Sequence, residues 1–312
     1  MRRHAHMPED RAAAASGGVA RFTGWLQRHL PKIVVAPSFL AALVFFYGFI
    51  IWTAYISLTG SRMLPDYEIE GFDNYVNIWR LSRWNTAVEN LAIFGILFIG
   101  MSMVVGCILA VLLDQRIRAE GALRTIYLYP MAISYIVTGT AWRWLMDPGI
   151  GIEAAVRNLG WESFSFDWIT NRDMAIYTIV IAAVWQASGF VMAMVLAALR
   201  GVDQEIIKAA WLDGASLPQI YRRIIIPSIR PVFLGAFVIL MHLAIKTFDL
   251  IMAMTSGGPG TATSLPATFM YDMAFQRDRL DFAATSAVMM LVTVTAIVVP
   301  YLYSEIRAGR RD

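Results

Sequence analysis

The chain has 312 residues, of which 58% are hydrophobic and only 16% are charged. Soluble domains average about 25% charged residues, so the composition excludes an ordinary soluble protein and predicts an all-α, polytopic membrane protein. A formal net charge of +3 predicts no nucleic-acid partner, a single cysteine excludes an intrachain disulfide framework, and four scattered histidines argue against a metal cluster.

Six apolar runs follow one another along the chain, and each is long enough to cross a bilayer as a helix, which takes roughly 20 residues. The first run is too long, and begins too far into the chain, for a cleaved signal peptide. We therefore expect six transmembrane helices, at about Val34–Leu58, Ala87–Leu113, Leu123–Leu145, Met174–Leu199, Val232–Met254 and Phe282–Tyr303. The expected organisation is an N-terminal tail, a first helix with its outer loop, a five-helix domain and a C-terminal tail, with boundaries at 1–33, 34–86, 87–303 and 304–312.

The positions of Lys and Arg predict the side of the membrane on which each loop lies, because cytoplasmic loops carry an excess of these residues. With a cytoplasmic N-terminus, the inner segments hold seventeen of the 26 Lys and Arg residues, whereas the outer loops hold seven. Both ends of the chain are therefore expected in the cytoplasm. The inner segments are then 1–33, 114–124, 200–231 and 304–312.

The inner segment 203–231 carries more local structure than a simple connection needs. Asp203 is placed to cap a short helix, and Gly214 lies where a left-handed residue ends one. Ser216 and Gln219 have the spacing of a capping box, so a second short helix follows. Pro227 and Pro231 are expected to end that helix and start the next span. From the residues alone, this helix pair fits a docking surface for another protein or an amphipathic hairpin lying on lipid headgroups.

The same segment resembles the EAA motif, in which Glu-Ala-Ala is followed by Gly and then by Ile-x-Leu-Pro. On these residues the chain resembles the membrane subunits (permeases) of binding-protein-dependent ABC importers, most closely the maltose-type sugar permeases, over about residues 87–303. Lys208 replaces the glutamate of the motif, with Glu205 as a nearby candidate for the missing acid, and Ile226 replaces its leucine. The matching residues are Ala209, Ala210, Gly214, Ile224 and Pro227, together with Asp213–Ser216, Phe248–Ile251 and Thr255–Pro259.

This resemblance implies the type I ABC importer transmembrane fold and a role as half of a translocation pathway. The implied partners are a second permease, two ATPase subunits, an extracytoplasmic solute-binding protein and membrane lipid, in the inner membrane of a bacterium. Closure of the ATPase subunits would be transmitted to the transmembrane helices by the two short helices of the segment 203–231. The implied docking residues are Glu205, Lys208, Ala209, Ala210, Asp213, Gly214, Ala215, Ser216, Ile224 and Pro227.

The sequence lacks the motif of an ATP-binding loop. None of its three lysines follows a glycine, as the lysine of a P-loop does, and neither HExxH nor GxSxG is present. We therefore expect a transport subunit that is not an enzyme and holds no cofactor, with ATP and Mg bound by the partner ATPase.

Polar and aromatic residues within the fourth and fifth runs are candidate solute contacts, because polar groups deep in a membrane span are costly. Aromatic rings stack on sugars, and amides and hydroxyls bond to them. Ala244 and Thr247 lie on the turn that resembles the sugar-contacting stretch of maltose-type permeases. Packing by small and polar residues explains each position equally well, and Lys246 is spaced to pair with Asp249. The candidates are Trp185, Gln186, Ser188, Phe190, Ala244, Thr247 and Phe248.

A six-span secondary transporter or channel that works without ATP is the alternative. It predicts internal repeats and broken helices. No clear repeat relates the two halves of the sequence.

Overall fold

The computed structural model describes residues 30, 32, 34–115 and 118–308, and the chain divides into two compact units, residues 1–55 and 56–312. Within the described residues the regular structure is helical, apart from an isolated bridge between Thr59 and Ile69. Nearly all of the expected N-terminal tail lies outside the described residues. The apolar helix that follows it covers Val34–Ile56 and includes the π-helical turn η1 (Leu43–Tyr47) and α2 (Gly48–Ile56).

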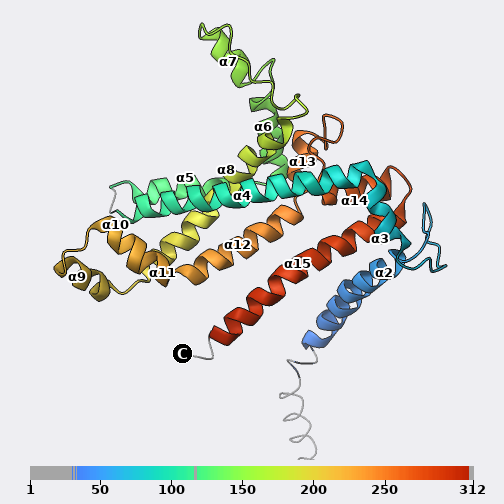
Figure 1. The fold of residues 1–312 in the computed structure, drawn as a ribbon, viewed down its shortest axis with the longest axis horizontal. Coiled ribbons are helices and arrows are strands. Elements are labelled where there is room, and N and C mark those ends of the chain that lie inside the picture. The colour runs from blue at the N-terminus through green and yellow to red at the C-terminus, as the bar shows by residue number, and fades with distance from the viewer. Residues whose placement is uncertain (1–29, 31, 33, 116–117, 309–312) are drawn as a thin grey trace, which may run out of the picture. The chain divides into compact units, whose positions relative to one another are not determined.

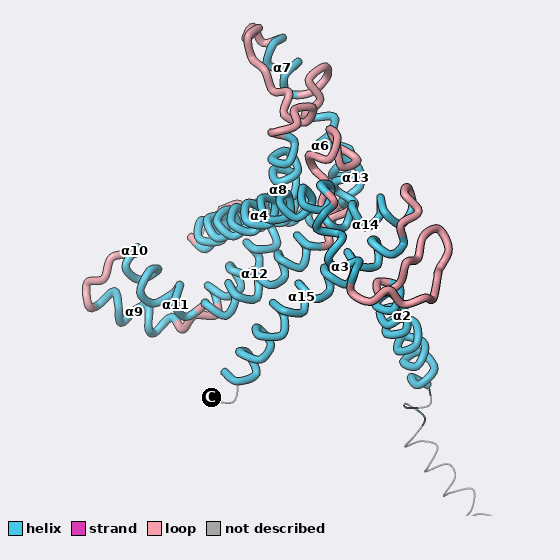
Figure 2. Tube along the Cα trace, turned by 45° about the vertical axis from the view of Figure 1, so that its right-hand side comes forward, coloured by secondary structure: helices cyan, strands magenta, loops and turns pink. Residues whose placement is uncertain are grey.

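Four long helices organise the second unit (Figures 1 and 2), and α4 packs along α8 more extensively than any other pair of helices. Gly106 of α4 faces Val191 of α8 so closely that a Cβ atom at this position would collide with the valine side chain. Helix α12 packs against both of them. The four helices are α4 (Ser82–Asp114), α8 (Ala175–Arg200), α12 (Arg230–Ile245) and α15 (Leu280–Ala308).

Shorter helices fill the connections between the long ones. The stretch 255–281, between the fifth and sixth expected helices, contains a ten-residue helix, α14, which packs on α15 and α4. The short elements are α3 (Asp73–Asn77), η2 (Ile78–Arg80), α5 (Glu120–Ala132), α6 (Tyr135–Leu145), α7 (Ile152–Asn158), α9 (Gln204–Leu212), α10 (Leu217–Ile220), η3 (Tyr221–Ile225), α11 (Ile226–Ser228), α13 (Asp249–Met254) and α14 (Pro266–Phe275).

The third expected transmembrane helix, at about Leu123–Leu145, is wrong as one continuous helix. It is divided into α5 and α6 by extended backbone at Ile133 and Ser134, and Ser134 caps α6 by accepting the backbone N–H of Ile136. Pro130 lies in the last turn of α5 and removes one backbone donor there. The runs expected at 87–113, 174–199 and 282–303 correspond to α4, α8 and α15.

The fifth expected helix is also broken. Helix α12 ends at Ile245, residues 246–248 are not helical, and α13 begins at Asp249. By length and composition, four described helices can cross a membrane, or five when the bent pair 217–228 and 230–245 is taken as one span. The count of six therefore stays a prediction. Helix α15 continues to Ala308, five residues into the expected C-terminal tail, and residues 309–312 lie outside the described part.

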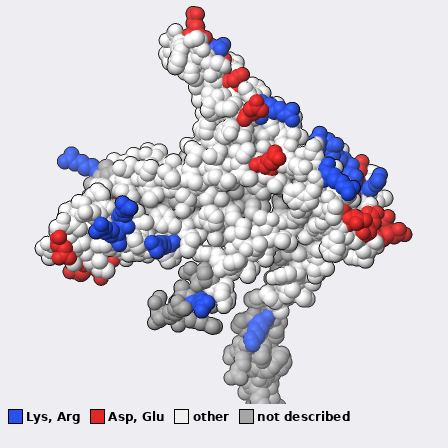
Figure 3. Space-filling view, viewed as in Figure 1, with Lys and Arg blue, Asp and Glu red and all other residues white. Residues whose placement is uncertain are grey.

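Charged side chains gather at two ends of the second unit (Figure 3). One group lies over α9 to α11, and the other lies over α7 and the loops near α3 and α14, with a face almost free of charge between them. This distribution is typical of a membrane protein, because charges are costly in the hydrocarbon region.

Candidate functional site: the docking segment and the membrane pathway

The first half of the segment 203–229, called the docking segment below, folds as its capping residues predict. The carboxylate of Asp203 accepts the backbone N–H of Glu205 at 2.8 Å and caps α9. The helix ends at Leu212, and Gly214 adopts a φ of +80°, a conformation that side chains with a Cβ rarely adopt. A sharp glycine turn therefore sets the direction of the second helix.

The second half also begins and ends as predicted. The backbone N–H of Ser216 donates to the side-chain oxygen of Gln219 at 2.9 Å, which completes the expected capping box. The helix ends between the two prolines, since α11 ends at Ser228 and α12 begins at Arg230 with Pro231 in its first turn. The π-helical turn η3, directly before α11, was not predicted. Pro227 has no backbone N–H to donate. In the next residue, the Ser228 hydroxyl donates to the Ile224 carbonyl oxygen at 2.7 Å.

The docking segment has an inner face and an outer face. Ala210 is buried with Ile220 and Ile225 in the main apolar core, whereas its neighbour in the motif, Ala209, is exposed. Of the other predicted docking residues, Ala215, Ile224 and Pro227 are half-buried, and the exposed ones are Glu205, Lys208, Asp213, Gly214 and Ser216.

Two apolar residues on the outer face were missed in the sequence. Trp211 is 54% exposed and Leu212 is 90% exposed. Together with Lys208 they share one side of α9, because residues three and four apart are neighbours on a helix. Large exposed apolar side chains on a structured segment are typical of a surface that contacts another protein or a membrane.

Lys208, which stands where the motif has glutamate, pairs with Glu205. The Nζ atom lies 2.8 Å from the Glu205 carboxylate, and both side chains are well exposed. The segment therefore presents a locally neutral pair at this position. Glu205 remains accessible as the candidate acid, although its charge is shared with the lysine.

The base of the docking segment is fastened to the end of α4. The Tyr221 hydroxyl donates to the Asp114 carboxylate at 2.9 Å and accepts the side-chain amide of Gln115 at 3.0 Å. Burial, together with the hydrogen bond and the negative charge of Asp114, raises the pKa of the Tyr221 phenol to about 12.

Arg200 at the end of α8 forms an ion pair with Glu120 at the start of α5, so each charge complements the dipole of its own helix.

The candidate solute contacts of α8 do not share one surface. Trp185 and Ser188 line a pocket of about 450 Å³ between α4, α5, α6 and α8. The Trp185 ring lies against Trp142 with ring centroids 5.8 Å apart. Gln186 is buried and bonded to the break between α5 and α6, and Phe190 packs against the core. Gly189 allows α8 to approach Tyr127 of α5, since a Cβ atom there would collide with the Tyr127 carbonyl oxygen.

The candidates of the fifth run lie at the break between α12 and α13. Thr247 and Phe248 line a small pocket of about 50 Å³ with Tyr135 of α6, whereas Ala244 is buried beneath them. Lys246 and Asp249 also line this pocket, but the helix between them is broken, and no ion pair joins these two described residues. The helical pairing expected for them does not occur.

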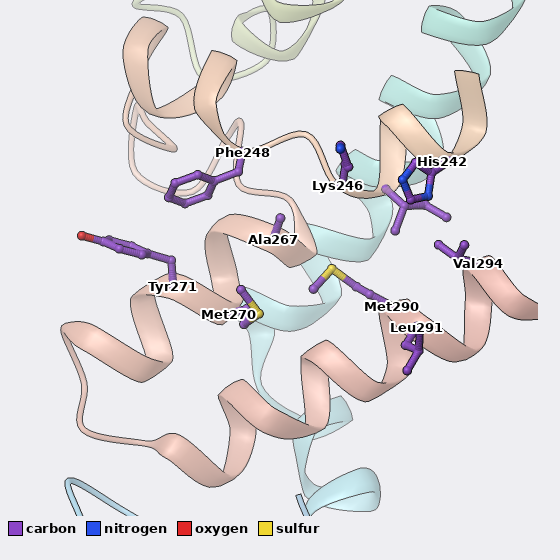
Figure 4. A pocket seen from close by; sticks show the side chains of 10 residues that line it. His242, Lys246, Phe248, Ala267, Met270, Tyr271, Met290, Leu291 and Val294 are labelled. Atoms are coloured by element: carbon purple, nitrogen blue, oxygen red, sulfur yellow. The ribbon is translucent and has the colours of Figure 1, made fainter. Parts of the chain in front are cut away.

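A larger pocket of about 440 Å³ opens between α12, α14 and α15, with His242 and Lys246 at one side (Figure 4). At the other end of this pocket, Phe248 and Tyr271 lie against one another, with ring centroids 5.2 Å apart. Tyr271 is an aromatic candidate that sequence reasoning missed, because the helix that places it beside the break could not be located from local pattern. The seven predicted contacts thus lie in two regions, and their role in solute binding stays a prediction.

Residues 21–308 match the model of a family described as the binding-protein-dependent transport system inner membrane component. The chain is 36% identical to a probable ABC transporter permease protein of Pyrococcus horikoshii, over 90% of this chain and 98% of that protein. It is 31% identical to the xylose/arabinose import permease protein XacH of Haloferax volcanii, over 78% of this chain and 77% of XacH.

The fold agrees with this match. A chain from the crystal structure of a bacterial ABC transporter involved in the import of the acidic polysaccharide alginate superposes with a TM-score of 0.79 at 20% identity, covering 92% of this chain and 99% of that one. The expected importer fold is confirmed, and the chain is a multi-pass membrane protein. Since the family match spans most of its length, the chain belongs to the inner membrane components of binding-protein-dependent transport systems, the permease subunits of ABC importers.

Proposed function

We propose that this permease carries a sugar or sugar-derived solute, and that the docking segment is where a cytoplasmic ATPase binds and drives transport. The observation that carries the proposal is the outer face of α9, where Trp211 and Leu212 are exposed on a capped helix. A segment that only joined two helices would gain nothing from this exposure. Burial of both side chains by a partner would remove apolar surface from water, which favours association.

The assembly we propose contains a second permease, two ATPase subunits that bind ATP and Mg, and an extracytoplasmic solute-binding protein, in the cytoplasmic membrane of a bacterium. Both ends of this chain would then lie in the cytoplasm with the docking segment. This chain would bind no cofactor and hydrolyse no ATP of its own. The charge distribution of Figure 3 supports this arrangement, since α9 to α11 form one charged end of the second unit.

The proposed solute class is supported by the relative XacH, which is named for xylose and arabinose, and by the side chains at the helix break. Phe248, Tyr271 and Thr247 place two aromatic rings and a hydroxyl close together. Binding measurements on the extracytoplasmic partner with a panel of pentoses, hexoses and disaccharides test the class. Binding of amino acids or metal ions instead of these sugars would contradict it.

Replacement of Gly214 by Val tests the docking role, because its φ of +80° is strained for a β-branched residue. Gly201→Ala is the matched control, since Gly201 ends α8 at a φ of −83° and its Cβ would meet only ordinary contacts. We expect Gly214→Val to abolish co-purification of the ATPase and ATP-dependent uptake while the chain still enters the membrane. Normal levels of both would contradict the docking role, and uptake that persists without ATP would indicate a secondary transporter.

A further inference from the structure

Helix α4 is held by side-chain hydrogen bonds at both of its ends. At one end, Tyr221 of the docking segment is bonded to Asp114 and Gln115, as described above. Apolar packing around Ile220 and Ile225 seats the segment without giving it a fixed direction, whereas a hydrogen bond to one carboxylate oxygen does. The Tyr221 hydroxyl is therefore a specific attachment between the docking segment and α4.

Near the opposite end of α4, Asn90 makes the second attachment. Its side-chain amide donates to the carbonyl oxygens of Thr261 at 3.2 Å and Ser264 at 3.0 Å. Asn90 is only 8% exposed, so these bonds are shielded from water. They fix α4 to the loop that follows α13.

Between these attachments α4 is an unbroken helix. It has 33 residues and no proline, whereas the third and fifth runs are each divided into two helices. The distance along the axis from Asn90 to Asp114 is about 36 Å at 1.5 Å per residue. The helix is continuous and packs along α8 and α12, so no break in it separates the two attachments.

The loop fixed by Asn90 follows directly after α13 and is held together by its own hydrogen bonds. The Thr255 and Thr263 hydroxyls lie 2.6 Å apart, and Thr263 donates to the Gly258 carbonyl oxygen at 2.9 Å. A displacement of this loop would therefore pull on α13 as a whole. Helix α13 begins directly after Thr247 and Phe248, the candidate solute contacts at the break.

We infer that α4 connects the docking segment to the opposite side of the membrane, with Tyr221 and Asn90 as the positioning residues that make it move with the ATPase and carry α13 along. This inference rests on the proposed docking role of the segment. Neither residue needs to touch the solute or the ATPase. Each fixes one end of the helix through which the two are coupled.

The test uses the complete transporter in proteoliposomes and measures three quantities: the amount of bound ATPase, the rate of ATP hydrolysis and the solute imported per ATP hydrolysed. Tyr221→Phe keeps the ring and removes the hydroxyl, and Asn90→Leu removes the two donors. We expect either variant to retain the ATPase within about twofold and to lower the solute imported per ATP by about fivefold or more, the lower end of typical coupling effects. Tyr129→Phe, at an exposed phenol of α5, and Ser102→Ala, at a buried α4 hydroxyl with no partner among the described residues, are the controls.

Asp114 supplies a second line of evidence if either variant folds poorly. Asp114→Asn keeps an acceptor for the Tyr221 hydroxyl and is expected to preserve import per ATP, whereas Asp114→Ala is expected to lower it as Tyr221→Phe does. The double variant Tyr221→Phe/Asp114→Ala should be no worse than either single one, because all three break the same bond.

An unchanged ratio in Tyr221→Phe and Asn90→Leu would overturn the inference, as would equal effects of Asp114→Asn and Asp114→Ala. Loss of ATPase binding in Tyr221→Phe would also overturn it, by making Tyr221 part of the docking surface. Failure of the unaltered transporter to bind an ATPase would instead refute the docking role itself.

Discussion

The side-chain amide of Gln186 in α8 donates a 2.7 Å hydrogen bond to the carbonyl oxygen of Ile133, at the break between α5 and α6. The residue is 4% exposed, and its own Oε1 atom has no partner among the described residues. A carbonyl freed by the end of a helix in an apolar environment needs such a donor. Gln186 therefore stabilises the break, whatever contact it makes with a solute.

Replacement of Gln186 by Met removes this donor while nearly keeping the side-chain volume. We expect a loss of about 1–3 kcal/mol, the cost of leaving one buried polar group unsatisfied. Thermal unfolding of the purified permease in detergent measures it. Ser188→Ala is the control, because the Ser188 hydroxyl makes only a long 3.5 Å contact with the Trp185 carbonyl oxygen. Equal melting temperatures for the two variants would show that the break does not depend on Gln186.

Gly189 lies one turn further along α8, where the helix meets Tyr127 of α5. Alanine at this position would place a Cβ atom against backbone, which cannot rotate away, so the two helices must separate. We expect a destabilisation of about 1–3 kcal/mol, as for overpacked cores. Gly95→Ala in α4 is the matched control, since nothing lies within 4 Å of its Cβ position and alanine favours the helix. Equal stability of the two variants would contradict the close α5–α8 contact.

The docking segment could be predicted from sequence because its signals are local. Asp203, Gly214 and Ser216 act on residues within three positions of themselves, so capping and turn chemistry place both helices. Pro227 and Pro231 also mark where the second helix ends and the next begins. Only the π-helical turn before Pro227 was not predicted, because the proline alone gives no sign of it.

The breaks in the third and fifth runs were not predicted. Apolar residues continue through the third at Ile133, whereas the fifth falls at Lys246 and Thr247, polar residues that fitted an ion pair or a solute contact within one continuous helix equally well. The third break depends on a bond from Gln186, 53 residues away from Ile133. The fifth is lined by residues of α6 and α14 as well as α12. The faces of helices that line a pathway follow from such distant contacts, which is why the predicted solute contacts divide between two regions.

Lys208→Ala tests whether the ion pair between Lys208 and Glu205 contributes to the stability of the fold. Its partner Glu205 is exposed, and exposed ion pairs are worth about 1 kcal/mol or less, so we expect little change in the melting temperature. Arg157→Ala is the comparison, because it leaves Glu153, which is 5% exposed, without its ion-pair partner. A larger loss of stability from Lys208→Ala than from Arg157→Ala would mean that the Lys208–Glu205 pair holds α9 together.

The raised pKa of Tyr221 predicts that the stability of the fold falls at strongly alkaline pH. An unperturbed tyrosine has a pKa of about 10, and the folded protein raises that of Tyr221 to about 12. The fold thus favours the neutral phenol. The stabilisation from its bond to Asp114 is complete below about pH 10 and is lost as the pH rises through about 12. The difference in tyrosinate absorbance between the permease and its Tyr221→Phe variant should show one group titrating well above pH 10. Titration of that group near pH 10 would contradict the bond to Asp114.

The most direct test of the docking segment compares two almost fully exposed leucines at different charged ends of the second unit. Leu212 lies on the outer face of α9 and is 90% exposed, and Leu159, directly after α7, is 87% exposed. A photo-crosslinking amino acid is introduced at either position in the membrane-embedded transporter. The account predicts that position 212 crosslinks to the ATPase subunit and position 159 does not. Crosslinking of the ATPase from 159, or to lipid alone from 212, would contradict it.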